Sequence, residues 1–325
     1  MPVITYREAV SQALKEALEE DERTFLIGED IGPYGGAFAV TKGLWEQYGQ
    51  RRIKDSPLSE SVITGAGIGA AMAGLRPIVE LMTINFSLLA SDQIVNHAAK
   101  LRYMSNGQFS IPLIIRTVTG SGAGVSATHS QCFEGWFASV PGLQVVVPTT
   151  PSDVLGLFRS CRDLDDPVLF VEHIMLYSTR GEVNDSPAKI PIGLADVKRE
   201  GQDISIISYS RMVQVSLAAA DVLSNYGIDA EVIDLRCLRP LDIQTLVDSV
   251  KKTHNVLVVE EAPRLGGFAG EVIALVQQEA FDFLDGPIGR IAGEEVPIPF
   301  SYPLEQLSIP DVDKVARAAC DVLGR

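Results

Sequence analysis

Four short segments of the sequence carry side chains that could do chemistry. They are residues 28–30, 55–60, 85–87 and 128–131. Their side chains include carboxylates that can hold a proton, an aromatic ring that can stack on a flat ligand, and a histidine that titrates near neutral pH. Each key residue also has a plain structural interpretation. Glu60 can complement a helix dipole, Phe86 can fill a core, and His129 can cap a turn.

These segments lie between elements that alternate between strand and helix. Strands are predicted at 24–27, 76–82, 112–117, 143–147, 168–172, 204–209, 230–235, 256–260 and 288–292. Helices are predicted after a capping box at Thr5 and Glu8, from 41, over 88–104, from 151, over 213–226 and 243–251, from 266 and over 311–323. Strands separated by helices form parallel sheets covered on both faces, so the predicted class is α/β with doubly wound domains. Ligands of such folds collect at the carboxyl ends of the strands.

The length of 325 residues and the spacing of these elements predict two domains. We expect an α/β domain over residues 1–180 and a second α/β domain over residues 203–325. The periodicity fails between them, where proline, glycine and charged residues are frequent. Residues 181–202 are therefore predicted to be an interdomain linker.

Charge and composition exclude several classes of function. Lys and Arg number 27 against 42 Asp and Glu, a formal net charge of −15, which disfavours nucleic acid as a partner. The apolar stretches are too short to cross a membrane. Four widely spaced cysteines without a Cys-x-x-Cys pair predict reduced, core-filling thiols and no zinc site. The first residues do not resemble a targeting peptide, so we expect the bacterial cytoplasm, or the plastid stroma for an organelle-encoded chain.

The run Gly65-Ala66-Gly67-Ile68-Gly69-Ala70 matches the dinucleotide fingerprint G-x-G-x-x-A. Glu80 stands near the distance at which an acidic residue would bind a ribose. That fingerprint requires a strand before the first glycine, however, and residues 56–61 are predicted to be a loop. A helix of small residues packed closely against a neighbour is the favoured interpretation, with nucleotide binding as the alternative.

Read together, the motifs identify a family. Those that carry the likeness are residues 28–30, 34–36, 40–44, 55–60, 85–87, 92–96, 129–131, 141–143, 235–242 and 259–261. In this order they resemble the beta subunit of the thiamine-diphosphate-dependent first component of pyruvate dehydrogenase. The resemblance covers essentially the full chain. It implies a pyrimidine-binding domain followed by a domain like the carboxyl-terminal domain of transketolase.

The resemblance also implies roles for three side chains. Glu60 matches the glutamate that hydrogen-bonds the pyrimidine ring of thiamine diphosphate and helps to activate the cofactor. Phe86 matches an aromatic residue that packs against the pyrimidine, and His129 matches a histidine near the reacting carbon. The implied reaction is oxidative decarboxylation of pyruvate with acetylation of a lipoyl group. A branched-chain 2-oxo acid is the alternative substrate, and a nucleotide-binding protein or an inactive scaffold is the alternative class.

The family holds Mg²⁺ and the cofactor diphosphate on a Gly-Asp-Gly motif, which this sequence lacks. The resemblance therefore implies that a separate alpha subunit supplies that half of the site, in an α₂β₂ heterotetramer. It also implies K⁺ bound by the backbone carbonyls of Leu113, Cys161, Leu164 and Asp166, although an ordinary helix end there is the alternative.

A further implied partner is the lipoyl-bearing dihydrolipoamide acetyltransferase core. It would dock on the second domain, where acidic residues could meet a basic module. These residues are Glu260, Glu261, Asp282, Asp285, Glu294 and Glu295. A solvated acidic face is the alternative interpretation.

Overall fold

The computed structural model describes residues 1–184 and 188–325, and the chain divides into two compact units. The first unit is Met1–Thr119 with Phe137–Ile192, and the second is Gly120–Trp136 with Gly193–Arg325. Both are α/β units with mainly parallel sheets, as the sequence predicts. The predicted linker at 181–202 differs in detail, because it contains strand β9 (Asp196–Arg199) and the end of β8 (Arg180–Glu182), while its residues 185–187 lie outside the described residues.

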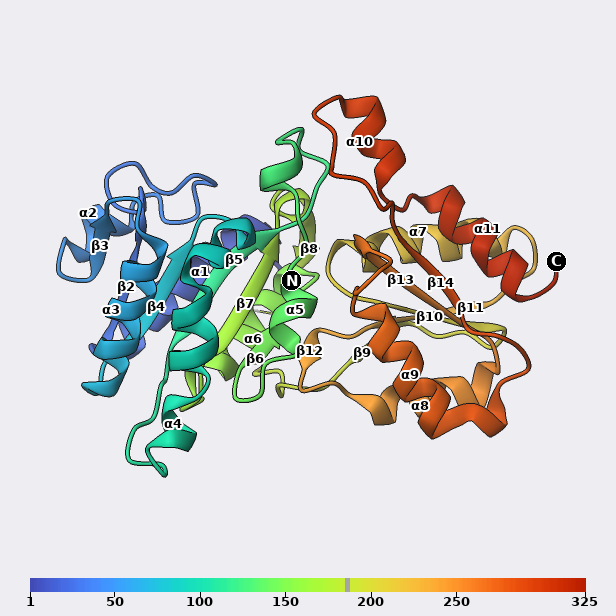
Figure 1. Cartoon of the computed structure of the whole chain (residues 1–325). Helices are drawn as coiled ribbons and strands as arrows, with labels where there is room; N and C mark the ends of the chain where they lie inside the picture. The colour runs from blue at the N-terminus through green and yellow to red at the C-terminus, as the bar shows by residue number, and fades with distance from the viewer. Residues whose placement is uncertain (185–187) are drawn as a thin grey trace. The chain divides into compact units, whose positions relative to one another are not determined.

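The first unit is built on a parallel sheet with the strand order β6-β7-β5-β4-β2-β3 (Figure 1). Its strands are β2 (Thr24–Glu29), β3 (Ile53–Ser56), β4 (Arg76–Leu81), β5 (Ile114–Thr119), β6 (Gln144–Val146) and β7 (Val168–His173). The sequence predicts all of them except β3. A short ribbon of β1 (Val3–Thr5) and β8 runs antiparallel beside this sheet's helices.

The helices of this unit are α1 (Tyr6–Glu20), α2 (Leu44–Tyr48), α3 (Glu60–Met72), α4 (Leu101–Met104) and α6 (Pro151–Arg162), with the 3₁₀ turn η4 (Ile174–Leu176). Helix α5 (Glu134–Ala138) spans the boundary between the units. Two predicted helix starts are confirmed, because Thr5 with Glu8 and Thr150 with Asp153 form reciprocal capping boxes. Helices α1 and α6 pack against each other, and α3 packs on β4.

The single helix predicted over 88–104 is wrong. The segment forms a 3₁₀ helix η1 (Ile84–Ala90), a π-helical turn η2 (Gln93–Ala98) and the short α4. The N–H of Ala99 donates to the carbonyl of Ile94, five residues back, at 3.1 Å. The wider turn inserts an extra residue and breaks the α-helical register, which a periodicity of apolar residues does not reveal.

The glycines of residues 65–70 lie inside α3, well after the helix begins at Glu60. A Cβ on Gly67 would come within 2.5 Å of Val79 Cγ2 on β4, so this glycine allows the helix to approach the sheet closely. The predicted close packing is therefore confirmed. The predicted loop is present at residues 57–59, between β3 and the start of α3, and the glycines are too far along the helix to form a phosphate-binding turn.

The second unit has a sheet with the order β14-β13-β10-β11-β9, in which β9 runs antiparallel and the other strands run parallel (Figure 1). Its strands are β10 (Ile204–Ser208), β11 (Ala230–Asp234), β13 (Val256–Pro263) and β14 (Gly289–Gly293), and β12 (Cys237–Arg239) lies in the same part of the chain. Its helices are η3 (Ala127–His129), α7 (Arg211–Ser224), α8 (Ile243–Thr253), α9 (Ala269–Ala280), η5 (Phe281–Phe283), α10 (Tyr302–Ser308) and α11 (Val312–Val322). The sequence gives no sign of α10.

One apolar core of this unit lies between the sheet and helices α7 and α11, with Ile206, Leu223 and Val315 among its buried residues. The thiols Cys161 and Cys237 are buried, and the partly exposed Cys320 packs against this core, so the core-filling interpretation holds for these three. Cys132 is also partly exposed. Within residues 1–184 and 188–325, no helix is long and apolar enough to cross a membrane.

Candidate active site

Three adjacent parallel strands bring predicted site residues to one edge of the first unit's sheet. Strand β2 lies between β3 and β4, and Gly28 pairs in register with Asp55 on one side and Glu80 on the other. Glu29 is the last residue of β2 and Glu60 begins the helix that follows β3. Phe86 lies in η1, which follows β4. The carboxyl edge of this sheet therefore holds both predicted cofactor-binding residues of this unit, Glu60 and Phe86.

Glu60 is a buried carboxyl group, with 7% of its surface exposed, in the first turn of α3. The partial positive charge of a helix N-terminus favours an acidic side chain there. Glu29 is 5% exposed, and its Oε1 accepts the backbone N–H of Ser59 at 3.1 Å. The sequence indicates residues 28–30 only as one of four segments that could do chemistry, whereas the structure gives Glu29 a definite contact beside Glu60.

The environment of Glu29 is acidic. Burial raises the pKa of the Glu29 carboxyl, and the nearby charges of Glu60, Asp30 and Glu80 raise it further, while the Ser59 N–H acts in the opposite direction. A proton is therefore held more readily on Glu29 than on an ordinary glutamate. The Glu29 carboxyl, which can carry a proton, therefore lies next to Ser59, the residue that precedes Glu60.

A buried ion-pair network lies under the same edge. Arg116 on β5 is 1% exposed and donates to Glu80, and its Nε and Nη2 each donate to a carboxylate oxygen of Glu172 at 2.8 Å. The Tyr177 hydroxyl donates to Glu172 at 2.6 Å. Burial raises the pKa of Glu80, against the effect of Arg116. Glu80, the residue of the ribose-binding alternative, is thus engaged by an arginine.

Phe86 is half-buried, and η1, which carries it, packs against both α3 and β4. The turn is fixed internally, since Asn85 Nδ2 donates to Thr83 Oγ1 at 3.1 Å and Ser87 Oγ donates to the Ile84 carbonyl at 2.5 Å. A partly accessible aromatic ring and a buried carboxyl on packed elements are what a flat, nitrogen-containing heterocycle needs for stacking and hydrogen bonding. These residues fit the pyrimidine half of thiamine diphosphate.

His129 belongs by its contacts to the second unit, where it ends the short turn η3. Its side chain is exposed, and its Nδ1 lies 3.0 Å from the Thr128 hydroxyl. The preceding glycine-rich loop is bound by two carboxylates of the same unit, Glu261 and Glu305.

The acidic face predicted on the second unit needs a correction. Glu260 is fully buried, pairs with Arg290 at 2.6 Å and accepts the N–H of Ala269 at 3.0 Å. Glu261 is also buried. Neither carboxylate can belong to a solvated face or meet a docking partner. The exposed members of the predicted set are Asp282, Asp285, Glu294 and Glu295.

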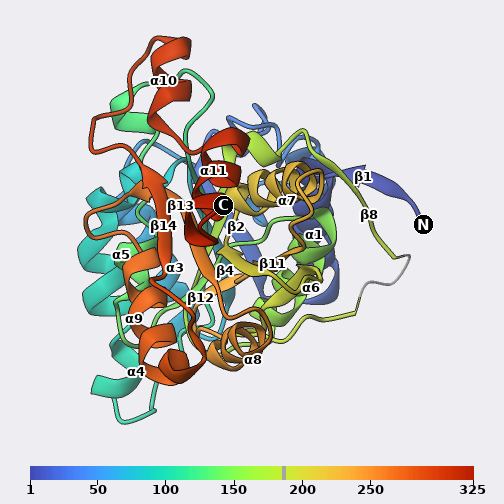
Figure 2. The same cartoon turned by 90° about the vertical axis from the view of Figure 1, so that its right-hand side faces the viewer.

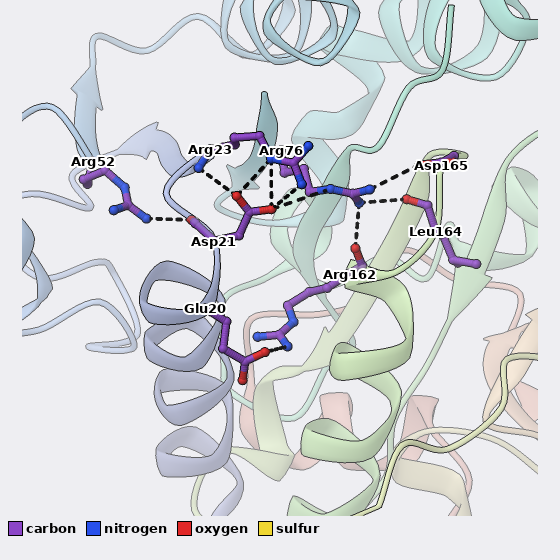
Figure 3. Close-up of polar contacts among 8 residues, drawn as sticks. All are labelled: Glu20, Asp21, Arg23, Arg52, Arg76, Arg162, Leu164 and Asp165. Atoms are coloured by element: carbon purple, nitrogen blue, oxygen red, sulfur yellow. Dashed lines mark hydrogen bonds and ion pairs between the residues drawn. The ribbon is translucent and has the colours of Figure 1, made fainter. Parts of the chain in front are cut away.

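Two of the residues whose carbonyls are predicted to bind K⁺, Cys161 and Leu164, line a pocket of about 320 Å³ at the carboxyl end of α6. Arg76 occupies this end: its Nη1 donates to the carbonyls of Arg162 at 2.7 Å and Leu164 at 3.2 Å (Figure 3). A K⁺ ion on the Leu164 carbonyl would be repelled by the guanidinium.

Two other carbonyls of this set also have partners. That of Leu113 accepts the N–H of Val168 at 2.9 Å, and that of Cys161 accepts the N–H of Leu164 at 3.2 Å. Asp166 uses its side chain to pair with Arg102 at 2.8 Å. These contacts do not fit K⁺ at the Leu164 carbonyl, and they favour the ordinary helix end.

Comparison with known families defines the class of protein. Residues 3–179 match the family described as transketolase, pyrimidine binding domain, and residues 193–315 match transketolase, C-terminal domain. A split-gene transketolase, solved as an inactive beta4 tetramer, superposes with a TM-score of 0.81 over 99% of this chain and 98% of that one, at 22% identity. A mutant transketolase from Pichia stipitis superposes with a TM-score of 0.71 over 100% of this chain and 47% of that one, at 16% identity. These structural similarities concern the fold.

Similarity in sequence is more specific. A mitochondrial pyruvate dehydrogenase E1 component subunit beta-2 from Oryza sativa is 47% identical over 97% of this chain and 85% of the relative. A pyruvate dehydrogenase E1 component subunit beta from Rickettsia felis is 44% identical over 97% of both chains. The chain belongs to the family of pyruvate dehydrogenase E1 beta subunits. The family and the fold predicted from the sequence motifs are thereby confirmed.

Proposed function

We propose that this chain is the beta subunit of a thiamine-diphosphate-dependent enzyme that decarboxylates pyruvate and transfers the acetyl group to the lipoyl group of a dihydrolipoamide acetyltransferase core, leading to acetyl-CoA. The observation that carries the proposal is Glu60, a buried carboxyl at the carboxyl edge of a parallel sheet. Thiamine diphosphate, when bound, supplies the carbon nucleophile and the electron sink that decarboxylation of a 2-oxo acid requires.

The residues of this chain orient the pyrimidine and handle protons. Glu60 would share a proton with a ring nitrogen of the pyrimidine, which needs a carboxyl shielded from water. Glu29 holds the backbone of Ser59 and thereby fixes where the α3 N-terminus presents Glu60. Phe86 would cover one face of the pyrimidine and exclude water there. His129 would move a proton, or orient the acceptor, during acetyl transfer.

An alpha subunit completes the site in this proposal. The sequence lacks the Gly-Asp-Gly motif, so we place the diphosphate and Mg²⁺ on the alpha subunit and the active site at the contact of alpha and beta chains in an α₂β₂ heterotetramer. Purification of this chain alone tests the division. Tight binding of Mg²⁺ and thiamine diphosphate by the isolated chain would contradict it.

The acyltransferase core is the second proposed partner. The exposed carboxylates Asp282, Asp285, Glu294 and Glu295 would meet a basic docking module, and such an attraction weakens with salt. A pull-down of the heterotetramer with the small binding domain of the core, at rising NaCl, tests this. Binding that does not change with salt, or no binding, argues against an electrostatic dock.

The decisive experiment is co-expression with the alpha subunit, followed by decarboxylation assays with pyruvate and 2-oxoisovalerate. We expect pyruvate to be preferred, although one methylene changes selectivity by only about 1–3 kcal/mol. Glu60→Gln should lower turnover by about 10²- to 10⁴-fold with the heterotetramer intact. Glu46→Gln, which alters an exposed glutamate in the first turn of α2, is the matched control and should keep full activity. Turnover unaffected by Glu60→Gln would instead indicate that this chain serves the heterotetramer only as a scaffold and supplies no catalytic carboxyl at position 60.

A further inference from the structure

The loop that precedes His129 is anchored by carboxylates from distant parts of the second unit. Glu261 on β13 accepts the backbone N–H of Ser121 at 2.7 Å and its hydroxyl at 2.6 Å. Glu305 on α10 accepts the N–H of Gly122 at 2.8 Å and the N–H of Gly124 at 3.1 Å. Figures 1 and 2 show this loop, in green, beside α10, in red.

The loop is shaped to make these contacts. Gly122 and Gly124 have φ values of +98° and +70°, which only glycine adopts without strain, and their N–H groups converge on one side chain. Backbone amides arranged in this way form an anion-binding nest. Here the anion is an internal one, because Glu305 is fully buried and its carboxylate fills the nest.

A third contact holds the loop from another element. Arg211, at the start of α7, donates to the carbonyl of Ser121 at 3.3 Å and lies 3.9 Å from a carboxylate oxygen of Glu261. The loop is therefore connected to β13, α7 and α10 at its first residues, and the same segment continues to His129, whose side chain is exposed. A hydrogen bond from a backbone N–H to a carboxylate is stronger than one between neutral groups. The carboxylates of Glu261 and Glu305 therefore restrain the loop backbone.

We propose that Glu305 and Glu261 are positioning residues for acetyl transfer: they fix the loop 120–126 and thereby place His129. The inference rests on the proposed role of His129. The proposal gives two buried acids of the second unit a function in the reaction. One of them, Glu261, was predicted from the sequence to belong to a docking face. Misplacing an active-site group by about 1 Å can cost roughly 100-fold in rate.

The test compares two reactions of the heterotetramer. Decarboxylation of pyruvate is followed with an artificial electron acceptor, and acetylation is followed with the isolated lipoyl domain. We expect Glu305→Ala to lower kcat for lipoyl acetylation by about 10- to 100-fold, with decarboxylation changed less than about 3-fold. Glu305→Gln keeps one acceptor oxygen and should fall between Glu305→Ala and the wild type. Glu271→Gln, an exposed glutamate on α9, is the control.

A double variant separates positioning from general structural damage. Adding Glu305→Ala to His129→Gln should cause little further loss, because residues that act as one unit are not additive. Equal losses in both reactions, or additive losses in the double variant, would overturn the proposal.

Hydrogen exchange supplies a readout that needs no activity. The peptide spanning 120–130 should exchange about 10-fold faster or more in Glu305→Ala, because its amides lose their carboxylate partner. Unchanged exchange would overturn the anchoring itself. A third outcome is that Glu305→Ala exchanges faster but His129→Gln is fully active in lipoyl acetylation. That result would refute the proposed role of His129, and with it the functional reason for positioning that residue, but the loop would still be anchored by Glu305.

Discussion

Glu29 accepts the backbone N–H of Ser59 at 3.1 Å, and so one buried glutamate holds the residue that immediately precedes another, Glu60. The contact joins the end of β2 to the beginning of α3. Ser59 makes no side-chain cap for that helix, so the Glu29 carboxylate satisfies one of its terminal N–H groups instead. The position of Glu60 therefore depends on an acid that is itself difficult to ionise.

This relationship predicts a pH-dependent effect of Glu29→Gln on stability. The pKa of Glu29 is raised above its ordinary value of 4.5 by burial and by neighbouring carboxylates. The folded wild type keeps its proton at a pH where the unfolded chain has lost it, so stability falls as pH rises from 4.5 through the folded pKa. Glutamine has no such loss and still accepts the Ser59 N–H. We expect the advantage of Glu29→Gln in the free energy of unfolding to grow from pH 4 to pH 8.

Urea unfolding at several pH values measures this difference. Glu46→Gln, on the exposed face of α2, is the control and should give a difference that does not change with pH. An advantage of Glu29→Gln that is constant or shrinks with rising pH would contradict the assignment of a raised pKa.

The buried guanidinium of Arg116 leads to a second prediction. Arg116→Met leaves Glu80 and Glu172 buried without their cation, and removing one partner of a buried ion pair costs about 3–5 kcal/mol. Arg102→Met, which breaks the exposed pair with Asp166, should cost less than about 1 kcal/mol. The two variants are compared by urea unfolding. Similar small losses for both would mean that the carboxylates accept protons or water at little cost.

Much of the fold follows from local patterns in the sequence. The capping boxes at Thr5 and Thr150 and the apolar strands of both sheets depend on neighbouring residues, and the structure confirms them. Only the family resemblance joined Glu60 and Phe86 in one site, because the strand that leads to Glu60 was not predicted. The strand β3 was missed because it is short and carries charged residues such as Lys54 and Asp55.

The contacts that sequence reasoning could not reach join residues far apart in the chain. Nothing local to Glu261 indicates that its partner is Ser121, 140 residues away, or that α10 brings Glu305 to the same loop. A glutamate such as Glu261, which follows another glutamate in the sequence, is usually exposed. Only partners from distant parts of the chain can make its burial favourable. Arg76 illustrates the same limit, because the carbonyls it binds, those of Arg162 and Leu164, lie more than 80 residues further along the chain.

Arg76 also carries the last prediction, which concerns K⁺. Its guanidinium donates to the carbonyls of Arg162 and Leu164 at the end of α6 and pairs with Asp165 at 3.2 Å. A cation at a helix carboxyl end satisfies unpaired carbonyls and complements the helix dipole. We expect Arg76→Met to cost about 1.5–3 kcal/mol, the usual value of hydrogen bonds to a charged group. Arg23→Met, which removes an exposed guanidinium that pairs with Asp21, should cost less than Arg76→Met.

The response to salt distinguishes the guanidinium from an added ion. We expect the melting temperature of the wild type to be the same in KCl and in choline chloride at equal ionic strength, because Arg76 already supplies the positive charge at these carbonyls. In Arg76→Met the carbonyls lose that charge, so K⁺ should raise the melting temperature above its value in choline chloride. Only a small monovalent cation can enter and be ligated by several carbonyl oxygens, which choline cannot do. A wild type that is stabilised by K⁺ as strongly as the variant would show that the ion binds beside Arg76 rather than in its place.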